Sequence, residues 1–450
     1  MQYVSTRGLA PALGFGDILL TGLAPDGGLY VPATWPTLAP EVWAPGRPYG
    51  EVAVDVMFPF VEGSLSRDDL AAMVSEAYAG FDHPAVCPVV PLGELHLLEL
   101  FWGPTLAFKD VALQMVGRLF DHELRARGER ATIVVATSGD TGSAAIDACV
   151  GRPTLDIVVL HPAGRVSEVQ RRQMTTVHEP NVHNVAVEGT FDDCQDLVKA
   201  LFADVAFREQ VRLSAMNSIN WARVMAQVVY YVTATAALGR CSFTVPSGNF
   251  GNIFAAWVAE QIGLPIDQLV IAANRNDIHA RWVTSGSMVA EEVVPTVSPS
   301  MDIQVSSNHE RLLFELSGRD GPATADLLGR FRSLGAVDAP RTNRFDAATI
   351  DDTTTLATIR RVHNEHGMLI DPHTAVGIAA ALTQRRSLDV PMVAVATAHP
   401  AKFPDAVEQA TGIRPALPAR LAGLLERDEH YDGLPNDISA VRAYVLARVT

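Results

Sequence analysis

Cysteine is scarce in this chain, and signals for export are missing. The four cysteines in 450 residues show no paired spacing, so they indicate neither a disulfide framework nor a zinc knuckle: Cys87, Cys149, Cys194 and Cys241. The first residues, Met-Gln-Tyr-Val-Ser-Thr-Arg, lack a basic segment followed by an apolar one. We therefore expect a reducing, cytoplasmic setting.

Positive charge and long apolar runs are also lacking. The formal net charge is −16 at pH 7, and no basic stretch is broad enough to follow a phosphate backbone, which argues against nucleic acid as a partner. Although 48% of the residues are hydrophobic, no apolar run reaches membrane-spanning length. The sequence predicts a soluble protein of two or three domains, in which an anionic ligand would need a local cationic pocket.

The two common nucleotide-binding fingerprints are absent, although two loops of a related kind are present. Neither GxGxxG nor the Lys-Ser/Thr ending of a Walker loop occurs. The loops 137–142 and 246–252 each follow a short apolar run and precede a helical pattern. Backbone amides at a helix N-terminus bind anions, so each loop is a candidate anion cradle. Either loop taken alone could equally be a tight turn.

One lysine stands between an apolar turn and an amphipathic helix. Gly103 and Pro104 break the chain, residues 106–108 are apolar, and Lys109 opens a run with apolar residues at helical spacing. Burial and the positive end of a helix both lower the pKa of an ammonium, which favours a nucleophilic amine. Most lysines at helix starts are solvated, so this interpretation depends on the neighbouring motifs.

The order of strands and helices predicts the fold class. Apolar strand patterns alternate with helical patterns from residue 131 onward, which indicates an α/β protein with mostly parallel, doubly wound sheets. We expect an N-terminal extension over 1–93, a large domain over 94–125 and 214–450, and a small mobile domain over 126–213. Periodicity is weaker over 274–345, which is typical of an insertion.

A polar cluster before a long helical run completes the pattern. Asn217, Ser218 and Arg223 lie together, and a guanidinium can hold phosphate or carboxylate with two hydrogen bonds. A lone arginine would more often be a surface residue. Two anion cradles, a cation and an activated amine together indicate pyridoxal phosphate acting on an anionic amino acid.

Five spaced motifs then resemble one family, threonine synthase, in its longer bacterial and fungal subfamily. The motifs are Phe108-Lys-Asp110, Ser138-Gly-Asp-Thr-Gly-Ser143, Asn217-Ser-Ile-Asn220 with Arg223, Ser247-Gly-Asn-Phe-Gly-Asn252 and Thr397-Ala-His-Pro-Ala-Lys402. The resemblance implies a fold-type II pyridoxal phosphate enzyme, similar to the tryptophan synthase β chain. The implied reaction is a lyase reaction in threonine biosynthesis, in which O-phospho-L-homoserine and water give L-threonine and phosphate.

The resemblance also implies roles for individual residues. Lys109 would hold the cofactor as a Schiff base beside Phe108, and the cofactor phosphate would lie on Gly248, Asn249, Phe250, Gly251 and Asn252. Thr397 would meet the pyridine nitrogen, and Asp140 stands where many fold-type II enzymes have asparagine near the 3-hydroxyl. Thr141 would lie beside the reacting carbons, and substrate would contact Ser138, Gly139, Thr141, Asn217, Ser218 and Arg223.

Several alternatives remain open at this point. The nearest rivals are a serine or threonine dehydratase, a cysteine synthase, and a degenerate relative that cleaves or only binds phosphorylated amino acids. A nucleotide-binding regulator is a rival from another class. A metal site drawn from His363, His366, Asp371 and His373 is disfavoured, because these residues mix helix and loop positions, and we expect no metal. The oligomeric state is expected to be a monomer or a homodimer.

Overall fold

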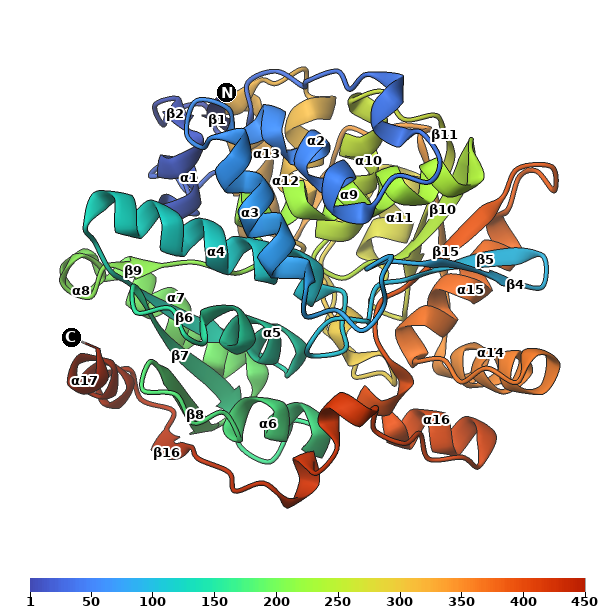
Figure 1. Ribbon diagram of the computed structural model, residues 1–450. Helices are drawn as coiled ribbons and strands as arrows, with labels where there is room; N and C mark the ends of the chain where they lie inside the picture. Colours follow the sequence, from blue (N-terminus) through green and yellow to red (C-terminus); the bar gives the residue numbers. More distant parts are fainter. Residues whose placement is uncertain (450) are drawn as a thin grey trace.

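Two parallel sheets dominate the computed structural model, which describes residues 1–449 (Figure 1). The larger sheet has the order β14-β11-β10-β15-β5-β4, with only β4 antiparallel to its neighbour. Its strands are β4 (Val89–Leu92), β5 (Leu95–Glu99), β10 (Cys241–Pro246), β11 (Ile266–Ala273), β14 (Phe345–Thr349) and β15 (Met392–Ala396). The prediction of an α/β fold with parallel, doubly wound sheets is confirmed.

The larger sheet is covered on both faces, which explains why its strands read as unbroken apolar runs. Along β11, Leu269 and Ile271 enter one hydrophobic cluster, whereas Val270 and Ala272 enter another. The second cluster includes residues of α14 (Asp352–His366) and α15 (Pro372–Gln384). The first includes residues of α9 (Trp221–Leu238) and α10 (Gly251–Gln261), two helices buried along most of their length.

The smaller sheet is entirely parallel, with the order β16-β8-β7-β6-β9. Its strands are β6 (Ala131–Ala136), β7 (Leu155–Pro162), β8 (Val182–Glu188), β9 (Leu213–Ser214) and β16 (Asp432–Pro435). The helices between them are α5 (Asp140–Cys149), α6 (Glu168–Thr175), α7 (Phe191–Ala203) and α8 (Val205–Gln210). The long helix α4 (Lys109–Arg127) packs against α5 and α9, so it joins the two sheets.

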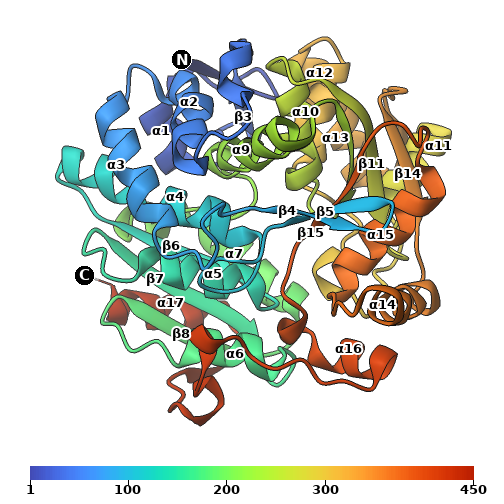
Figure 2. The same cartoon turned by 45° about the vertical axis from the view of Figure 1, so that its right-hand side comes forward.

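The N-terminal extension forms a small antiparallel sheet with helices that lie on the central helices. The sheet has the order β2-β1-β3, made of β1 (Gln2–Ser5), β2 (Leu13–Gly14) and β3 (Tyr30–Pro32). Helix α1 (Phe15–Thr21) lies between β2 and β3 in the chain, and α2 (Tyr49–Val61) and α3 (Arg67–Tyr78) follow. Ser66 caps α3, whose buried face includes Leu70, Met73, Val74 and Ala77. Helix α2 packs on α9, and α3 packs on α4 (Figure 2).

The excursion over 274–345 has its own short elements, and β14 then joins the large sheet. They are α11 (Ile278–Ser285), β12 (Ser287–Val289), α12 (His309–Leu316), α13 (Gly321–Leu334) and β13 (Ala336–Asp338), with a 3-10 turn over Pro299–Met301. Other 3-10 turns span Pro40–Trp43, Pro400–Lys402, Ala419–Leu421 and Leu424–Glu426.

The C-terminal segment lies on the small sheet, which differs from the predicted assignment of all of 214–450 to the large domain. After α16 (Pro404–Thr411) the chain runs along the molecule to β16 and α17 (Ile438–Arg448), which packs on α7 (Figure 1). Strand β16 pairs with β8. Its sequence Asp-Gly-Leu-Pro carries no strand pattern, and only Val441 and Val445 of α17 are buried. The other predicted domain borders stay a prediction.

Candidate active site

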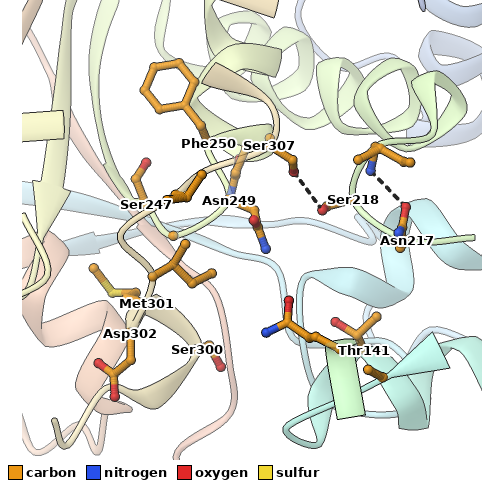
Figure 3. A pocket seen from close by; sticks show the side chains of 18 of the residues that line it. Thr141, Asn217, Ser218, Ser247, Asn249, Phe250, Ser300, Met301, Asp302 and Ser307 are labelled. Carbon is orange, nitrogen blue, oxygen red and sulfur yellow. Dashed lines mark hydrogen bonds between the residues drawn. The ribbon is translucent and has the colours of Figure 1, made fainter. Parts of the chain in front are cut away.

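Residues at the carboxyl ends of β6, β10 and β15 line a cavity of about 720 Å³ (Figure 3). Open α/β sheets bind ligands at this end of their strands. The cavity collects most of the residues that the sequence singles out, namely Phe108, Lys109, Asp140, Thr141, Asn217, Ser218, Arg223, Gly248, Asn249, Phe250, Gly251, Asn252 and Thr397. Ser138 and Gly139 are not among its lining residues.

A tight turn fixes Lys109 at the first position of α4. The turn residue Leu106 is buried and has a positive φ of 64°, and its carbonyl accepts a hydrogen bond from the N–H of His399 at 3.0 Å. The N–H of Phe108 donates to the carbonyl of Thr397 at 2.8 Å. These bonds tie the turn to the segment after β15, so Lys109 and Thr397 are brought to the same cavity.

The ammonium of Lys109 lies 3.2 Å from Oδ2 of Asp140, and its side chain is only 12% exposed. Burial lowers the pKa of Lys109 below its ordinary value, and the positive charges of Lys402 and Arg223 act in the same direction against the attraction of Asp140. Asp140 is shared between Lys109 and Lys402, so its attraction does not cancel the effect of burial. The structure therefore favours the lowered pKa of Lys109 that the sequence predicts. A larger share of neutral amine is therefore available at neutral pH.

Asp140, the first residue of α5, is the centre of the polar contacts. It accepts hydrogen bonds from Gln170 Nε2 at 2.9 Å and from Ser300 Oγ at 3.2 Å, and Lys402 Nζ lies 3.0 Å from its Oδ1. Burial alone would raise the pKa of Asp140, but the charges of Lys109 and Lys402 outweigh burial and hold the pKa well below its usual range. Asp140 is therefore a carboxylate, and it accepts hydrogen bonds without donating any.

The loop before α5 is held by internal hydrogen bonds that the sequence did not predict. The hydroxyl of Thr137 accepts hydrogen bonds from the N–H groups of Gly139 and Gly142, both at 2.9 Å. Gly139 has a φ of 137°, and a Cβ there would lie 2.5 Å from the side chain of Gln170, so only glycine fits. Two amides predicted to face an anion thus already have an acceptor, while Asp140 and Thr141 face the cavity.

The loop before α10 is the better-formed anion cradle. Phe250 is buried and has a positive φ of 63°, and it directly precedes the helix. A Cβ on Gly248 would lie 2.8 Å from the carbonyl oxygen of Ser300, so the two backbones are in close approach. A positive φ at a bulky residue is strained, and such strain is found mainly at functional sites. Figure 3 shows Asn249 projecting into the cavity from this loop.

Two polar atoms of this cradle have no hydrogen-bond partner within residues 1–449. They are Oγ of Ser247 and Nδ2 of Asn252, both in buried residues that line the cavity. The other end of the Asn252 amide is fixed, because its Oδ1 accepts from the hydroxyls of Tyr230 and Tyr231, each at 2.6 Å. Buried donors are nearly always satisfied in proteins, so these two atoms indicate a bound polar group.

Arg223 is a buried cation with no anionic partner among the described residues. It lies in the first turn of α9, which Asn220 caps, and it is 4% exposed. Nη1 makes only a long bond of 3.5 Å to the carbonyl of Met216, and Nε has no partner in the described part of the chain. Burial lowers the pKa of Arg223 to about 10. Because an unpaired buried charge is costly, a second anion in this cavity would be bound strongly.

Asn217 and Ser218 lie in the turn just before α9. The Oδ1 of Asn217 accepts from the N–H of Ile219 at 3.2 Å, and the Ser218 hydroxyl lies 3.2 Å from that of Ser307 (Figure 3). Asn308 donates to the carbonyl of Ser218 at 2.9 Å. The excursion over 274–345 therefore closes one side of the site.

That wall was missed by sequence reasoning, because it has little regular structure. Ser300, Met301, Asp302 and Ser307 line the cavity (Figure 3). Asp302 fixes the conformation of this wall through three hydrogen bonds. Its carboxylate accepts from Asn274 Nδ2 at 2.8 Å, Asn276 Nδ2 at 3.0 Å and Thr296 Oγ1 at 2.7 Å. A polar cluster rich in Ser, Thr and Asn between periodic segments was its only signal in the sequence.

The histidine nearest the cavity is already fully engaged. His373 shares a hydrogen bond of 2.8 Å with Asp371 through Nδ1, and its Nε2 accepts from the N–H of Ser300 at 3.1 Å. Over residues 1–449, no group of three or more His, Cys, Asp or Glu side chains is arranged to hold a metal ion. This arrangement gives His373 a structural role at the cavity wall.

Comparison with known proteins decides the family. Three sequence models cover the chain: threonine synthase N terminus over 2–78, pyridoxal-phosphate dependent enzyme over 91–398, and threonine synthase, C-terminal, over 374–445. The threonine synthase of Pseudomonas aeruginosa is 53% identical, covering 99% of this chain and 98% of that protein. The chain belongs to the threonine synthase family.

Solved structures of threonine synthase agree with this assignment over the whole chain. The pyridoxal-phosphate-bound threonine synthase of Brucella melitensis is 50% identical with a TM-score of 0.96, covering 100% of this chain and 99% of that one. The yeast threonine synthase is 35% identical with a TM-score of 0.93, covering 99% and 98%. The predicted fold-type II architecture, pyridoxal phosphate cofactor and lyase class are confirmed by family membership.

Threonine synthases act on a small molecule, in line with the expectation of a small-molecule substrate. Within residues 1–449, the structure contains no helix with the length and apolar character needed to cross a membrane. All four cysteines are free and buried.

Proposed function

We propose that this chain converts O-phospho-L-homoserine and water to L-threonine and phosphate, with pyridoxal phosphate as cofactor. The observation that carries the proposal is the pair of anion sites in the cavity that Lys109 lines. The loop over 247–252 offers unsatisfied donors for one phosphate, and Arg223 is a buried cation without a carboxylate partner among residues 1–449. A cofactor phosphate and a substrate phosphate would each find a site.

The residues of the cavity fit the cofactor. Ser247 Oγ and Asn252 Nδ2 are buried donors without partners in residues 1–449, and the N-terminus of α10 adds a positive dipole, so a dianionic phosphate suits this loop. Lys109 would hold the aldehyde carbon through Nζ, and Thr397 would meet the ring nitrogen. When bound, pyridoxal phosphate supplies an electron sink next to the substrate's reacting carbons.

Lys109 would also move protons. Its lowered pKa and its position at the cavity wall suit an amine that takes a proton from a carbon and returns one later. Asp140, held as a carboxylate, would keep this amine oriented through their 3.2 Å contact. Thr141, one residue further into α5, lines the same wall and would lie beside the reacting carbons.

Arg223 would select the phosphorylated substrate and stabilise the leaving phosphate. A guanidinium in a buried site binds a phosphate oxygen pair far more strongly than it would in water. Asn217 and Ser218 would add uncharged donors around the same group. Ser138 and Gly139 do not line the cavity in this structure, so they would reach the phosphate only when the small domain closes. A serine or threonine dehydratase has no leaving phosphate to hold, so the buried Arg223 favours threonine synthase over those rivals.

Assembly, domain motion and compartment belong to the same proposal. We place the enzyme in the cytoplasm as a monomer or homodimer, and the four free cysteines are consistent with a reducing compartment. The domain division follows the predicted borders, 1–93, 94–125 with 214–450, and 126–213, with 432–448 moved to the small domain. Closure of the small domain would exclude water until the phosphate has left.

The direct test is the visible absorbance of the purified protein with and without O-phospho-L-homoserine, with phosphate and threonine measured in parallel. A yellow protein that forms both products in equal amounts supports the proposal. A yellow protein that ignores this substrate refutes the assigned reaction and leaves the cofactor site. ATP binding by a colourless protein would instead support a nucleotide-binding regulator.

Replacing the proposed Schiff-base lysine gives the sharpest check on the site. Lys109→Ala should lose the visible band of the loaded protein and reduce turnover by several orders of magnitude, because the amine both holds the cofactor and moves the proton. The matched control is Lys199→Ala, since Lys199 is 71% exposed and paired with Asp196. It should keep the visible band. Near-normal threonine production by Lys109→Ala would contradict the assignment.

A further inference from the structure

Asp140 sits between two lysines that differ in accessibility. Lys109 Nζ lies 3.2 Å from Oδ2, and Lys402 Nζ lies 3.0 Å from Oδ1. Lys109 faces the cavity, whereas Lys402 is fully buried and is not among the residues that line it. The chain has only three lysines, the third being Lys199. Two of the three therefore contact a single carboxylate.

Oxygen atoms surround the ammonium of Lys402. Besides its ion pair with Asp140 at 3.0 Å, it donates hydrogen bonds to the carbonyl of Thr105 at 2.6 Å and to Oε1 of Gln173 at 3.0 Å. Thr105 is fixed in turn, because its N–H and hydroxyl donate to Asp110 at 2.8 Å and 2.5 Å. Two hydrogen bonds and an ion pair favour the charged form of this group.

The two lysines must therefore play different parts. The amine of Lys109 has to lose its charge or be covalently occupied while the enzyme works. A buried carboxylate that loses its only counter-ion takes up a proton. Lys402 would prevent this protonation of Asp140, because Lys402 stays beside the carboxylate whether Lys109 is charged, neutral or covalently occupied.

We propose that Lys402 is a positioning residue: it is the permanent counter-ion of Asp140 and keeps this carboxylate ionised, and so accepting hydrogen bonds, whatever the charge on Lys109. The inference rests on the proposed cofactor site at Lys109. The proposal also accounts for Asp140 at the position where many fold-type II enzymes have asparagine. A buried aspartate needs a counter-ion, which Lys402 provides, whereas the neutral amide of asparagine does not.

Other charged groups near Asp140 do not replace Lys402. Both ring nitrogens of His373 are engaged by Ser300 and Asp371 rather than by Asp140. The charge of Arg223 lowers the pKa of Lys109, but among residues 1–449 Arg223 forms no ion pair with Asp140. Asp110 lies beyond Thr105 and is negative or neutral, so it cannot serve as a counter-ion.

The test compares the pH dependence of the visible band in the cofactor-loaded wild type, Lys402→Met, Asp140→Asn and the double variant. Lys402→Met should gain a titration step from Asp140 at a pH above the ordinary range of a carboxylate, because burial is then opposed by one cation fewer. The double variant should lack that step, and Lys402→Arg should restore the wild-type profile. An unchanged profile in Lys402→Met, or a step that persists in the double variant, would overturn the proposal.

A second measurement on the unaltered sequence protects the proposal against variants that fail to fold. Labelling with ¹⁵Nζ-lysine gives a spectrum of only three side chains. The Lys402 signal of the loaded protein is assigned by elimination, because Lys199→Ala removes the signal of the exposed lysine and Lys109 would be bound to the cofactor. It should be the signal of an ammonium. A neutral-amine signal would refute the proposal. Failure to make threonine would not alter either readout, so the two proposals fail separately.

Discussion

Arg223 offers a prediction in which stability and function move in opposite directions. The lowering of its pKa to about 10 by burial corresponds to about 3 kcal/mol of unfavourable free energy for keeping the charge in the folded protein. Below about pH 10 this cost is present in full, and it fades at higher pH. Arg223→Met removes the charge but keeps most of the buried apolar contact, so it should raise the free energy of unfolding by about 1 to 3 kcal/mol.

The same substitution should damage catalysis. If Arg223 binds the substrate phosphate in a desolvated site, its loss should cost about 2 to 5 kcal/mol in kcat/KM for O-phospho-L-homoserine, a fall between about 30-fold and several thousand-fold. Phosphate release under steady-state conditions and chemical unfolding at neutral pH measure the two effects. Cofactor affinity should change far less than kcat/KM, because Arg223 lies outside the 247–252 loop.

Arg311 is the matched control, because it is equally buried but each of its three nitrogens donates a hydrogen bond. The acceptors are the carbonyls of Tyr30 at 3.0 Å and Ile219 at 2.5 Å and the side chain of Asn308. Burial lowers the pKa of Arg311 to about 9, so its charge also opposes folding, but Arg311→Met leaves three buried acceptors unsatisfied at about 1 to 3 kcal/mol each. This loss should make Arg311→Met less stable than the wild type. If Arg223→Met destabilised the protein as Arg311→Met does, or kept its kcat/KM, the argument for an anion-binding guanidinium would fail.

Two further predictions concern the cradle and the C-terminal segment. Gly248→Ala would place Cβ 2.8 Å from the carbonyl of Ser300, so overpacking of about 1 to 3 kcal/mol should weaken pyridoxal phosphate binding by about 5-fold to about 150-fold in a titration of cofactor-free protein. Gly329→Ala, in an open helix position, should instead stabilise the fold by about 1 kcal/mol, and equal cofactor affinity in the two variants would refute this prediction. Glu429 has a pKa lowered to about 2 by its bidentate contact with Arg171, so it stabilises the fold above about pH 4.5 and loses this effect as pH falls through 2. Glu429→Gln should cost about 1 to 2 kcal/mol at pH 7 and converge with wild type in strong acid, measured by thermal unfolding; a constant difference at all pH values would contradict the assignment.

Local signals in the sequence were sufficient for much of the fold. The apolar spacing after Lys109 predicted α4, which begins at that residue. Thr190 and the two acidic residues after it are a local signal of the same kind, and they start α7 with a capping box. Helix ends were less certain: α5 begins at Asp140, inside the loop 137–142 that was expected to precede it. Periodicity and caps are local properties, so they report on elements more reliably than on their ends.

The motifs of the sequence also indicated the family and the candidate site residues, because the glycine loops, the helix-start lysine and their order along the chain can be read from the sequence alone. Only the tertiary structure decided what surrounds them. The wall over 300–307 and the placement of β16 depend on pairings between segments hundreds of residues apart. The same holds for the isolation of Arg223 from every described carboxylate and for the contact of Lys402 with Asp140. Burial and charge pairing are properties of the packed chain, and no spacing in the sequence encodes them.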